Sequence, residues 1–231
     1  MQRRTAKALV MIRAVCYNPY QVIWMKTNYQ KQTDTVLAAL TGEKPRLLLQ
    51  SCCGPCSSYV LEYLTQHFRV TVLYYNPNIQ PREEYDKRLH WQRELIAQLP
   101  TPEAVDILEC EYDGARYTEA VRGLEREPEG GARCTVCFRL RLEETARLAK
   151  AHGYDYFCTT LTVSPHKDAE RINAIGAALA ARYGVAWLPS DFKKREGYKR
   201  SIELSKQYGL YRQDYCGCLL SKPVDKPGAD V

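Results

Sequence analysis

The sequence predicts an α/β fold: a parallel-sheet domain with a mostly helical extension at its carboxyl end. Short aliphatic or β-branched runs alternate with segments of helical period, and turn residues close each run. No internal repeat and no apolar run of membrane-spanning length interrupts this alternation. Regular alternation of strand and helix is typical of a parallel sheet with right-handed crossovers. At 231 residues the chain can bury one substantial core, which we place at residues 45–190.

Residues 1–44 are predicted to form an N-terminal extension outside this core, because they carry no sustained hydrophobic period. Met25 opens a stretch that resembles a translation start followed by a short helix, so a native start there, without residues 1–24, stays open. The apolar run at residues 8–12 is cut short by Arg13, and no small-residue cleavage site follows it. We therefore expect a cytoplasmic protein without membrane contact, and no function for Cys16.

The first strand is predicted at Leu47–Leu49, since a short unbroken aliphatic run is typical of a strand covered on both faces. Gly54 and Pro55 break this run, and Ser57 and Ser58 are placed to cap a helix. Further strands are predicted at 70–75, 105–111 and 156–161, with a short extended segment at 185–189. Helices are predicted at 82–98, 138–152 and 169–183, and a polar helix followed by a loop at 115–131.

Seven of the ten cysteines fall into three tight groups: Cys52, Cys53 and Cys56; Cys134 and Cys137; Cys216 and Cys218. Each group lies in a segment rich in turn residues, so we expect loops that converge at one end of the parallel sheet. The first group follows a strand and precedes a helix, whose dipole favours thiolate over thiol. In a long chain without a signal peptide, clustered thiols are typical of metal binding or redox chemistry. Cys110 and Cys158 lie in strand-like runs and are expected to pack as small apolar side chains.

Two of these groups offer four thiolates to one metal centre. Cys52-Cys53 and Cys134/Cys137 suit an iron–sulfur cluster or tetrahedral zinc, and spacing alone does not decide between them. A structural zinc site usually takes two CxxC knuckles in a small ribbon, whereas these pairs lie far apart in an α/β core. This context favours an iron–sulfur cluster, with zinc and a metal-free site as alternatives.

The CxC pair, Cys216-Gly-Cys218, indicates different chemistry. A disulfide between residues this close is strained and easily reduced, which suits a redox-active pair, and two further metal ligands are the alternative. Separately, Cys53-Gly-Pro-Cys56 matches the CxxC of thioredoxin-like thiol-disulfide oxidoreductases, which is the alternative function. Such enzymes do not need the other two cysteine groups.

Two further residues are candidates for proton transfer. His166 follows Ser-Pro in a loop after a predicted strand, where it suits a proton donor, a substrate contact or a plain capping role. Asp214 precedes the CxC pair and suits an acid or an extra metal ligand, as do Asp191 and Tyr215.

Residues 191–222 form a basic, aromatic segment. It contains Lys193, Lys194, Arg195, Lys199, Arg200, Lys206 and Arg212, interleaved with Phe192, Tyr198, Tyr208, Tyr211 and Tyr215. This composition, in a chain of net charge +6, is typical of a surface that binds unpaired nucleic acid, although a solvated helix face has the same pattern. Residues 223–231 are expected to be a disordered tail.

Five blocks of the sequence resemble the epoxyqueuosine reductase family of the QueH type. They are SCCGPCSS, YYNPNIQPREEY, CTVCFRLRLEETA, TTLTVSPHKD and DFKKREGYKRSIELSKQYGLYRQDYCGC. The resemblance covers about residues 44–222, and the joint occurrence of five blocks is far more specific than one CxxC. Residues 1–24 fall outside it.

This resemblance implies a nucleotide-hydrolase-like fold of the HUP or PP-loop type, and the last step of queuosine synthesis. In that step the epoxide of epoxyqueuosine, at the wobble position of tRNA, becomes an alkene. The implied site is a [4Fe–4S] cluster on Cys52, Cys53, Cys134 and Cys137, with a redox-active disulfide between Cys216 and Cys218. An additional iron beside the cluster is also implied, and its ligands are unassigned. The resemblance also implies that the enzyme needs no cobalamin. The implied partners are a tRNA anticodon loop and an external electron donor of unassigned identity.

Overall fold

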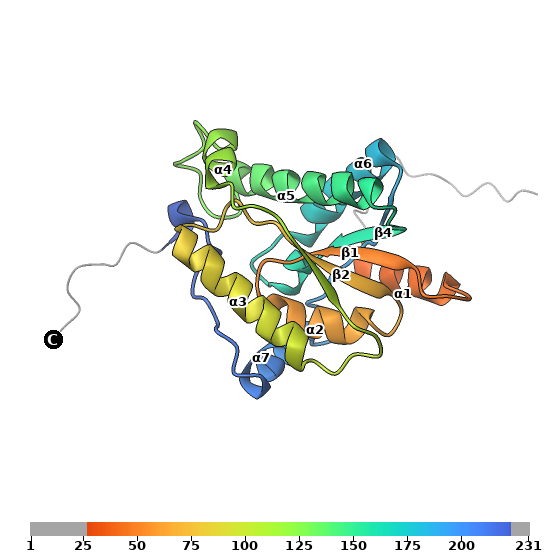
Figure 1. Ribbon diagram of the computed structural model, residues 1–231. Helices are drawn as coiled ribbons and strands as arrows, with labels where there is room; N and C mark the ends of the chain where they lie inside the picture. The colour runs from red at the N-terminus through yellow and green to blue at the C-terminus, as the bar shows by residue number, and fades with distance from the viewer. Residues whose placement is uncertain (1–26, 223–231) are drawn as a thin grey trace, which may run out of the picture.

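The computed structural model describes residues 27–222 and contains one fully parallel five-stranded sheet. The strands are β1 (Arg46–Gln50), β2 (Arg69–Tyr74), β3 (Asp106–Glu109), β4 (Tyr156–Thr159) and β5 (Ala186–Trp187). Their order is β3-β2-β1-β4-β5 (Figure 1). The chain adds β2 and β3 on one side of β1, and then crosses back to add β4 and β5 on the other side. This doubly wound arrangement confirms the predicted α/β class and its parallel sheet.

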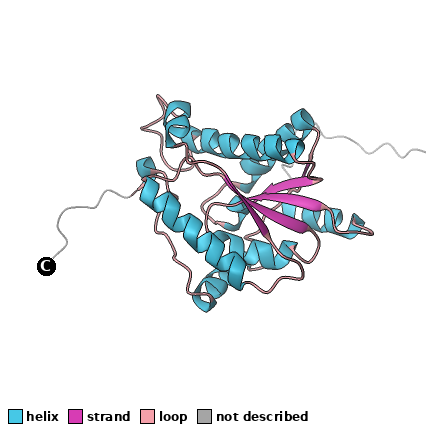
Figure 2. Cartoon of the chain, in the orientation of Figure 1, coloured by secondary structure: helices cyan, strands magenta, loops and turns pink. Residues whose placement is uncertain are grey.

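Helices cover both faces of the sheet (Figures 1 and 2). One face carries α1 (Tyr29–Ala39), α2 (Gly54–Leu64) and α3 (Arg82–Gln98), and α7 (Gly197–Gln207) packs on α2. The other face carries α5 (Ala132–Ala151) and α6 (Ala169–Tyr183), and the short α4 (Gly114–Ala120) packs on α5. Two 3₁₀ turns, η1 (Thr160–Val163) and η2 (Leu219–Ser221), complete the described chain. None of the helices between residues 27 and 222 is long and apolar enough to cross a bilayer.

The aliphatic run of β1 is the centre of the core. Leu47 and Leu49 pack into the cluster beneath α2, whereas Leu48 packs into the cluster beneath α5, and all three are fully buried. Successive side chains of a strand point to opposite faces, so a strand covered on both faces needs an unbroken apolar run.

Helix α2 begins earlier than predicted. It starts at Gly54, and Pro55 occupies its first turn, where a missing N–H is tolerated and the fixed φ suits a helix. Ser57 and Ser58 therefore do not cap the helix; their hydroxyls donate to the carbonyls of Cys53 (2.9 Å) and Pro55 (3.0 Å) inside it.

Helix α5 also begins earlier, at Ala132 instead of Phe138. Cys134 and Cys137 are consequently on the first two turns of a helix, and the expectation that they lie in a loop is wrong. The reason is that Gly131, in an extended conformation, already ends the loop and serves as the N-cap.

Helix α1 is more closely attached to the core than an outlying extension would be. Thr33 is fully buried and its hydroxyl donates to the carbonyl of Pro189 at 2.6 Å. Val36 and Leu37 pack against the cluster beneath α2. The predictions for Met25 as a start, for Cys16 and for residues 223–231 concern positions outside the described residues.

Candidate active site

A cavity of about 390 Å³ lies at the carboxyl edge of the sheet, next to the point where the strand order reverses between β1 and β4. Segments that follow β1, β2 and β4 line it, together with the start of α5 and residues 212–218. Ligands of open α/β sheets bind at this position, because loops from neighbouring strands diverge there. The fold alone therefore makes this cavity the expected binding site.

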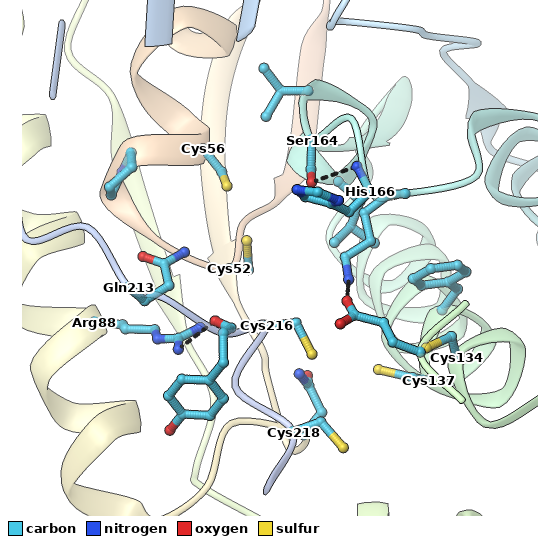
Figure 3. A pocket seen from close by; sticks show the side chains of 18 of the residues that line it. Cys52, Cys56, Arg88, Cys134, Cys137, Ser164, His166, Gln213, Cys216 and Cys218 are labelled. Atoms are coloured by element: carbon cyan, nitrogen blue, oxygen red, sulfur yellow. Dashed lines mark hydrogen bonds and ion pairs between the residues drawn. The ribbon is translucent and has the colours of Figure 1, made fainter. Parts of the chain in front are cut away.

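All three cysteine groups reach this cavity, and their side chains surround one space (Figure 3). Its walls include Cys52, Cys56, Cys134, Cys137, Cys216 and Cys218. The predicted convergence of separate thiol-bearing segments is therefore present in the structure. The nine cysteines within residues 27–222 are free thiols.

The first group consists of three closely spaced thiols. The sulfur atoms of Cys52, Cys53 and Cys56 all lie within 4.8 Å of one another, and those of Cys52 and Cys53 are 3.7 Å apart. Cys53 is the N-cap of α2 and Cys56 lies in its first turn, so the helix N-terminus faces the group. Three thiols at this separation could hold a metal ion.

The thiols of this group differ in acidity. Hydrogen bonds from Cys53 and Cys56 lower the pKa of Cys52 well below its usual value, and the charges of Arg141 and Arg88 act in the same direction. The same hydrogen bonding raises the pKa of Cys53 to about 12 and raises that of Cys56. Cys52 is therefore the most acidic thiol of the group.

The second group lies on one face of α5. Cys134 and Cys137 are three residues apart, so both side chains project from the same side of the helix toward the cavity (Figure 3). The Cys134 sulfur accepts a hydrogen bond from the backbone N–H of Gly130 at 3.2 Å. Burial raises the pKa of Cys137 to about 11. Both thiols are buried, and the hydrogen bond fixes the position of the Cys134 sulfur.

The third group, the CxC pair, is positioned by its glycine. Gly217 has a φ of +101°, and its carbonyl accepts from the backbone N–H of Gln80 at 2.9 Å. A Cβ at this position would lie 2.8 Å from Ile79 and 3.1 Å from Arg88. Only glycine combines this conformation with so close an approach. Cys218 is buried, and its sulfur is 2.9 Å from the hydroxyl of Tyr117.

Polar side chains fasten the CxC segment to the rest of the site. Arg88, which is buried, binds Glu84 at 2.6 Å and donates to the carbonyl of Tyr215 at 3.2 Å. The Tyr215 hydroxyl donates to the carbonyl of Gln80 at 2.8 Å. Gln213 donates to the Cys53 sulfur at 3.0 Å, so this segment touches the first thiol group directly.

The candidate proton donors occupy the rim. His166 and Asp214 are exposed and line the cavity, and the backbone N–H of His166 donates to Ser164 Oγ at 3.3 Å. Asp191 instead pairs with Lys193 at 2.5 Å and does not line the cavity. Of the two aspartates, only Asp214 therefore faces the cavity.

The basic, aromatic segment is only partly a free cationic surface. Arg195 pairs with Asp34, Arg200 with Glu62, and Lys199 with Glu196. Phe192 is fully buried in the core and offers no stacking surface. Tyr198 and Arg212 line the cavity. Tyr215 lines it as well, so these three cationic or aromatic side chains of the segment face the site.

With this geometry established, comparison with known proteins identifies the family. The family model described as Epoxyqueuosine reductase QueH matches residues 47–223. This chain belongs to the QueH family. Relatives named Epoxyqueuosine reductase QueH include one from Staphylococcus epidermidis, 44% identical over 202 residues, which are 85% of each chain. The relative from Streptococcus pyogenes is 44% identical over 206 residues (87% of this chain, 79% of the relative), and that from Thermotoga maritima is 35% identical over 181 (76% and 89%).

Membership in the QueH family confirms the resemblance that the five sequence blocks predicted. The family match spans all three cysteine groups and the whole carboxyl-edge cavity. It also disfavours the thioredoxin-like alternative, which left two of these groups without a role.

Several residues of this QueH-family site were not predicted from sequence. Cys56 was not assigned as a ligand, although its position three residues after Cys53 already brings it near that thiol at the start of a helix. Tyr117, Gln213 and Arg141 were missed because their neighbours are distant in sequence.

Proposed function

We propose that this protein reduces epoxyqueuosine in tRNA to queuosine. The reaction removes the epoxide oxygen as water and leaves an alkene, which requires two electrons and two protons. The observation that carries the proposal is the gathering of six thiols from three separate segments around one cavity, in a chain of the QueH family. Ordinary side chains other than thiols supply no electrons, so a redox centre of this kind is needed.

We assign Cys52, Cys53, Cys134 and Cys137 as ligands of a [4Fe–4S] cluster. The donor set fits such a group, because all four are free cysteines, three of them (Cys52, Cys134 and Cys137) line the same cavity, and thiolate is the usual ligand of these clusters. A bound cluster supplies electrons one at a time. Cys56 offers a further thiolate for the additional iron, and we expect no requirement for cobalamin.

We assign the CxC pair as the two-electron donor. Oxidation of the Cys216 and Cys218 thiols to a disulfide forms one S–S bond and releases two electrons and two protons, which balances the reduction of the epoxide. Cys216 lines the cavity directly, and the contact between Cys218 and Tyr117 gives its proton a neighbouring hydroxyl. A reductant from outside the protein then restores the dithiol.

We assign His166 and Asp214 as proton donors because both lie on the rim, where solvent can return the protons that they give. The anticodon loop is single-stranded, so its modified base can leave the stack and enter the cavity. Tyr198 and Arg212 line the cavity, which supports a role for Tyr198 in stacking on a base and for Arg212 in binding a phosphate.

Purification under anaerobic conditions, followed by analysis of iron, acid-labile sulfide and zinc, tests the cofactor assignment. The proposal expects near-equal amounts of iron and sulfide and the broad visible absorbance of a cluster, lost in Cys134→Ala. Zinc in place of iron would contradict it. Reduction of protein disulfides by a metal-free protein would instead support the thioredoxin-like alternative.

A further inference from the structure

Three arginines in the described chain are almost completely buried, and one of them lacks strong partners. Arg88 binds Glu84 and the carbonyl of Tyr215, as described above. Arg133 donates to the carbonyl of Glu125 at 2.8 Å, to that of Leu220 at 3.2 Å and to Ser221 Oγ at 2.8 Å. Arg141, only 3% exposed, makes one side-chain hydrogen bond, of 3.5 Å, to Asn76.

The charge of Arg141 has no carboxylate partner within residues 27–222, and its Nε atom has no hydrogen-bond acceptor. A buried charge without a counter-charge is strongly destabilising, so we expect an anion beside Arg141 in the working protein. We therefore look for the anion that balances this charge in the cavity that Arg141 lines.

The surroundings of Arg141 identify that anion as the sulfur centre. Arg141 lies four residues after Cys137 and seven after Cys134, on the same face of α5, and it lines the same cavity. Cys137, Cys52 and Cys216, one from each cysteine group, line that cavity with it.

We infer that Arg141 is a positioning residue that balances the negative charge of the sulfur centre and thereby makes its reduction easier. The inference rests on the proposed cluster. Each electron added to a thiolate-bound cluster adds negative charge, so a fixed cation beside it stabilises the reduced form and raises the reduction potential.

A chain of buried polar groups holds the residue that Arg141 contacts. The Thr159 hydroxyl donates to Gln50 at 2.8 Å, and Gln50 donates to the Asn76 side-chain oxygen at 3.0 Å. The Asn76 amide donates to the carbonyl of Ser51 at 2.7 Å. These residues follow or end β4, β1 and β2, so the sheet itself orients the oxygen that faces the guanidinium.

The test is a redox titration of the iron-loaded protein in which Arg141→Met and Arg141→Lys are compared with wild type. Arg147→Met is the matched control, because it removes the same charge from the same helix at an exposed position paired with Glu144. Iron content and thermal unfolding are measured on each variant. Arg141→Lys retains the charge and keeps the comparison valid if Arg141→Met does not fold.

We expect the reduction equilibrium of the cluster in Arg141→Met to weaken at least tenfold, about 59 mV for a one-electron couple. Arg141→Lys should fall between it and wild type, and Arg147→Met should match wild type. An unchanged potential in an iron-loaded Arg141→Met, or a rise only in the KM for tRNA, would overturn the inference and leave the proposed function standing. The inference would also be overturned if the reduction potential fell as far in Arg141→Lys as in Arg141→Met, because the lysine retains the positive charge. A wild-type protein without iron would overturn the proposed cofactor itself.

Discussion

At the scale of single residues, the site depends on thiols that the fold brings close to one another. Cys52, Cys53 and Cys56 form one group only because a strand end and a helix N-terminus meet there. Cys158 shows the contrast: it is fully buried in the core, burial raises its pKa to about 12, and it was correctly predicted to be a packing residue. Position, more than residue type, separates a reactive cysteine from an inert one.

Cys56→Ala tests whether the third thiol of the first group binds iron. We expect a lower iron content per chain, because Cys56 is close enough to its two neighbours to share a metal with them. The matched control is Cys110→Ala, which removes a half-buried thiol that does not line the cavity. Equal iron in the Cys56 variant and the control would remove Cys56 from the ligand set.

At the scale of elements, patterning predicted regular segments better than helix starts. The bounds of α3 and α6 agree with prediction, since Pro81 and Asp168 precede them and Gly184 ends α6. The predicted start of α5 is wrong because Cys134 and Cys137, which follow a glycine-rich loop, already belong to the helix. Arg141 was missed for a related reason. A helix that begins at Phe138 leaves out Cys134 and Cys137, so their position on the same helix face as Arg141 could not be predicted.

Gly217→Ala tests whether the CxC segment must keep its conformation. The added methyl group would approach Ile79 and Arg88 too closely, so the segment should shift and turnover should fall at least tenfold while the cluster absorbance stays. A non-glycine residue in the left-handed region also costs about 1–2 kcal/mol.

Gly123→Ala is the control for that conformational cost. Gly123 has a φ of +82° and nothing within 4 Å of the added methyl group, so it should lose similar stability without losing turnover. The measurements are thermal unfolding and product formation. Full activity in the Gly217 variant would show that the exact placement of the CxC pair is unimportant.

At the scale of the whole molecule, parallel topology brings together segments that are distant in sequence. The carboxyl ends of β1, β2 and β4 lie at one edge, and the first turns of α5 and the CxC segment close the cavity over them. The sequence allowed this convergence to be predicted, because a parallel sheet aligns its loops. It did not allow the buried arginines or the pairs of Arg195 with Asp34 and Arg200 with Glu62 to be predicted, because those depend on partners from other elements.

These ion pairs decide which cations are expected to bind tRNA. Arg212 is exposed, lines the cavity and has no carboxylate partner within residues 27–222, so Arg212→Gln should weaken binding. The salt dependence of log K should become shallower by roughly 0.7 for each lost contact with a single-stranded phosphate. Lys199→Gln is the control, since Lys199 pairs with Glu196. An unchanged slope for Arg212→Gln in binding titrations at several salt concentrations would contradict this role.

The most direct test is one anaerobic turnover of tRNA that carries epoxyqueuosine, with pre-reduced protein and mass analysis of the wobble nucleoside. The account predicts that the nucleoside loses one oxygen atom in wild type, and that Cys216→Ser retains the cluster absorbance but leaves the epoxide intact. Unreacted epoxide with iron-loaded, reduced wild-type protein would contradict the central claim.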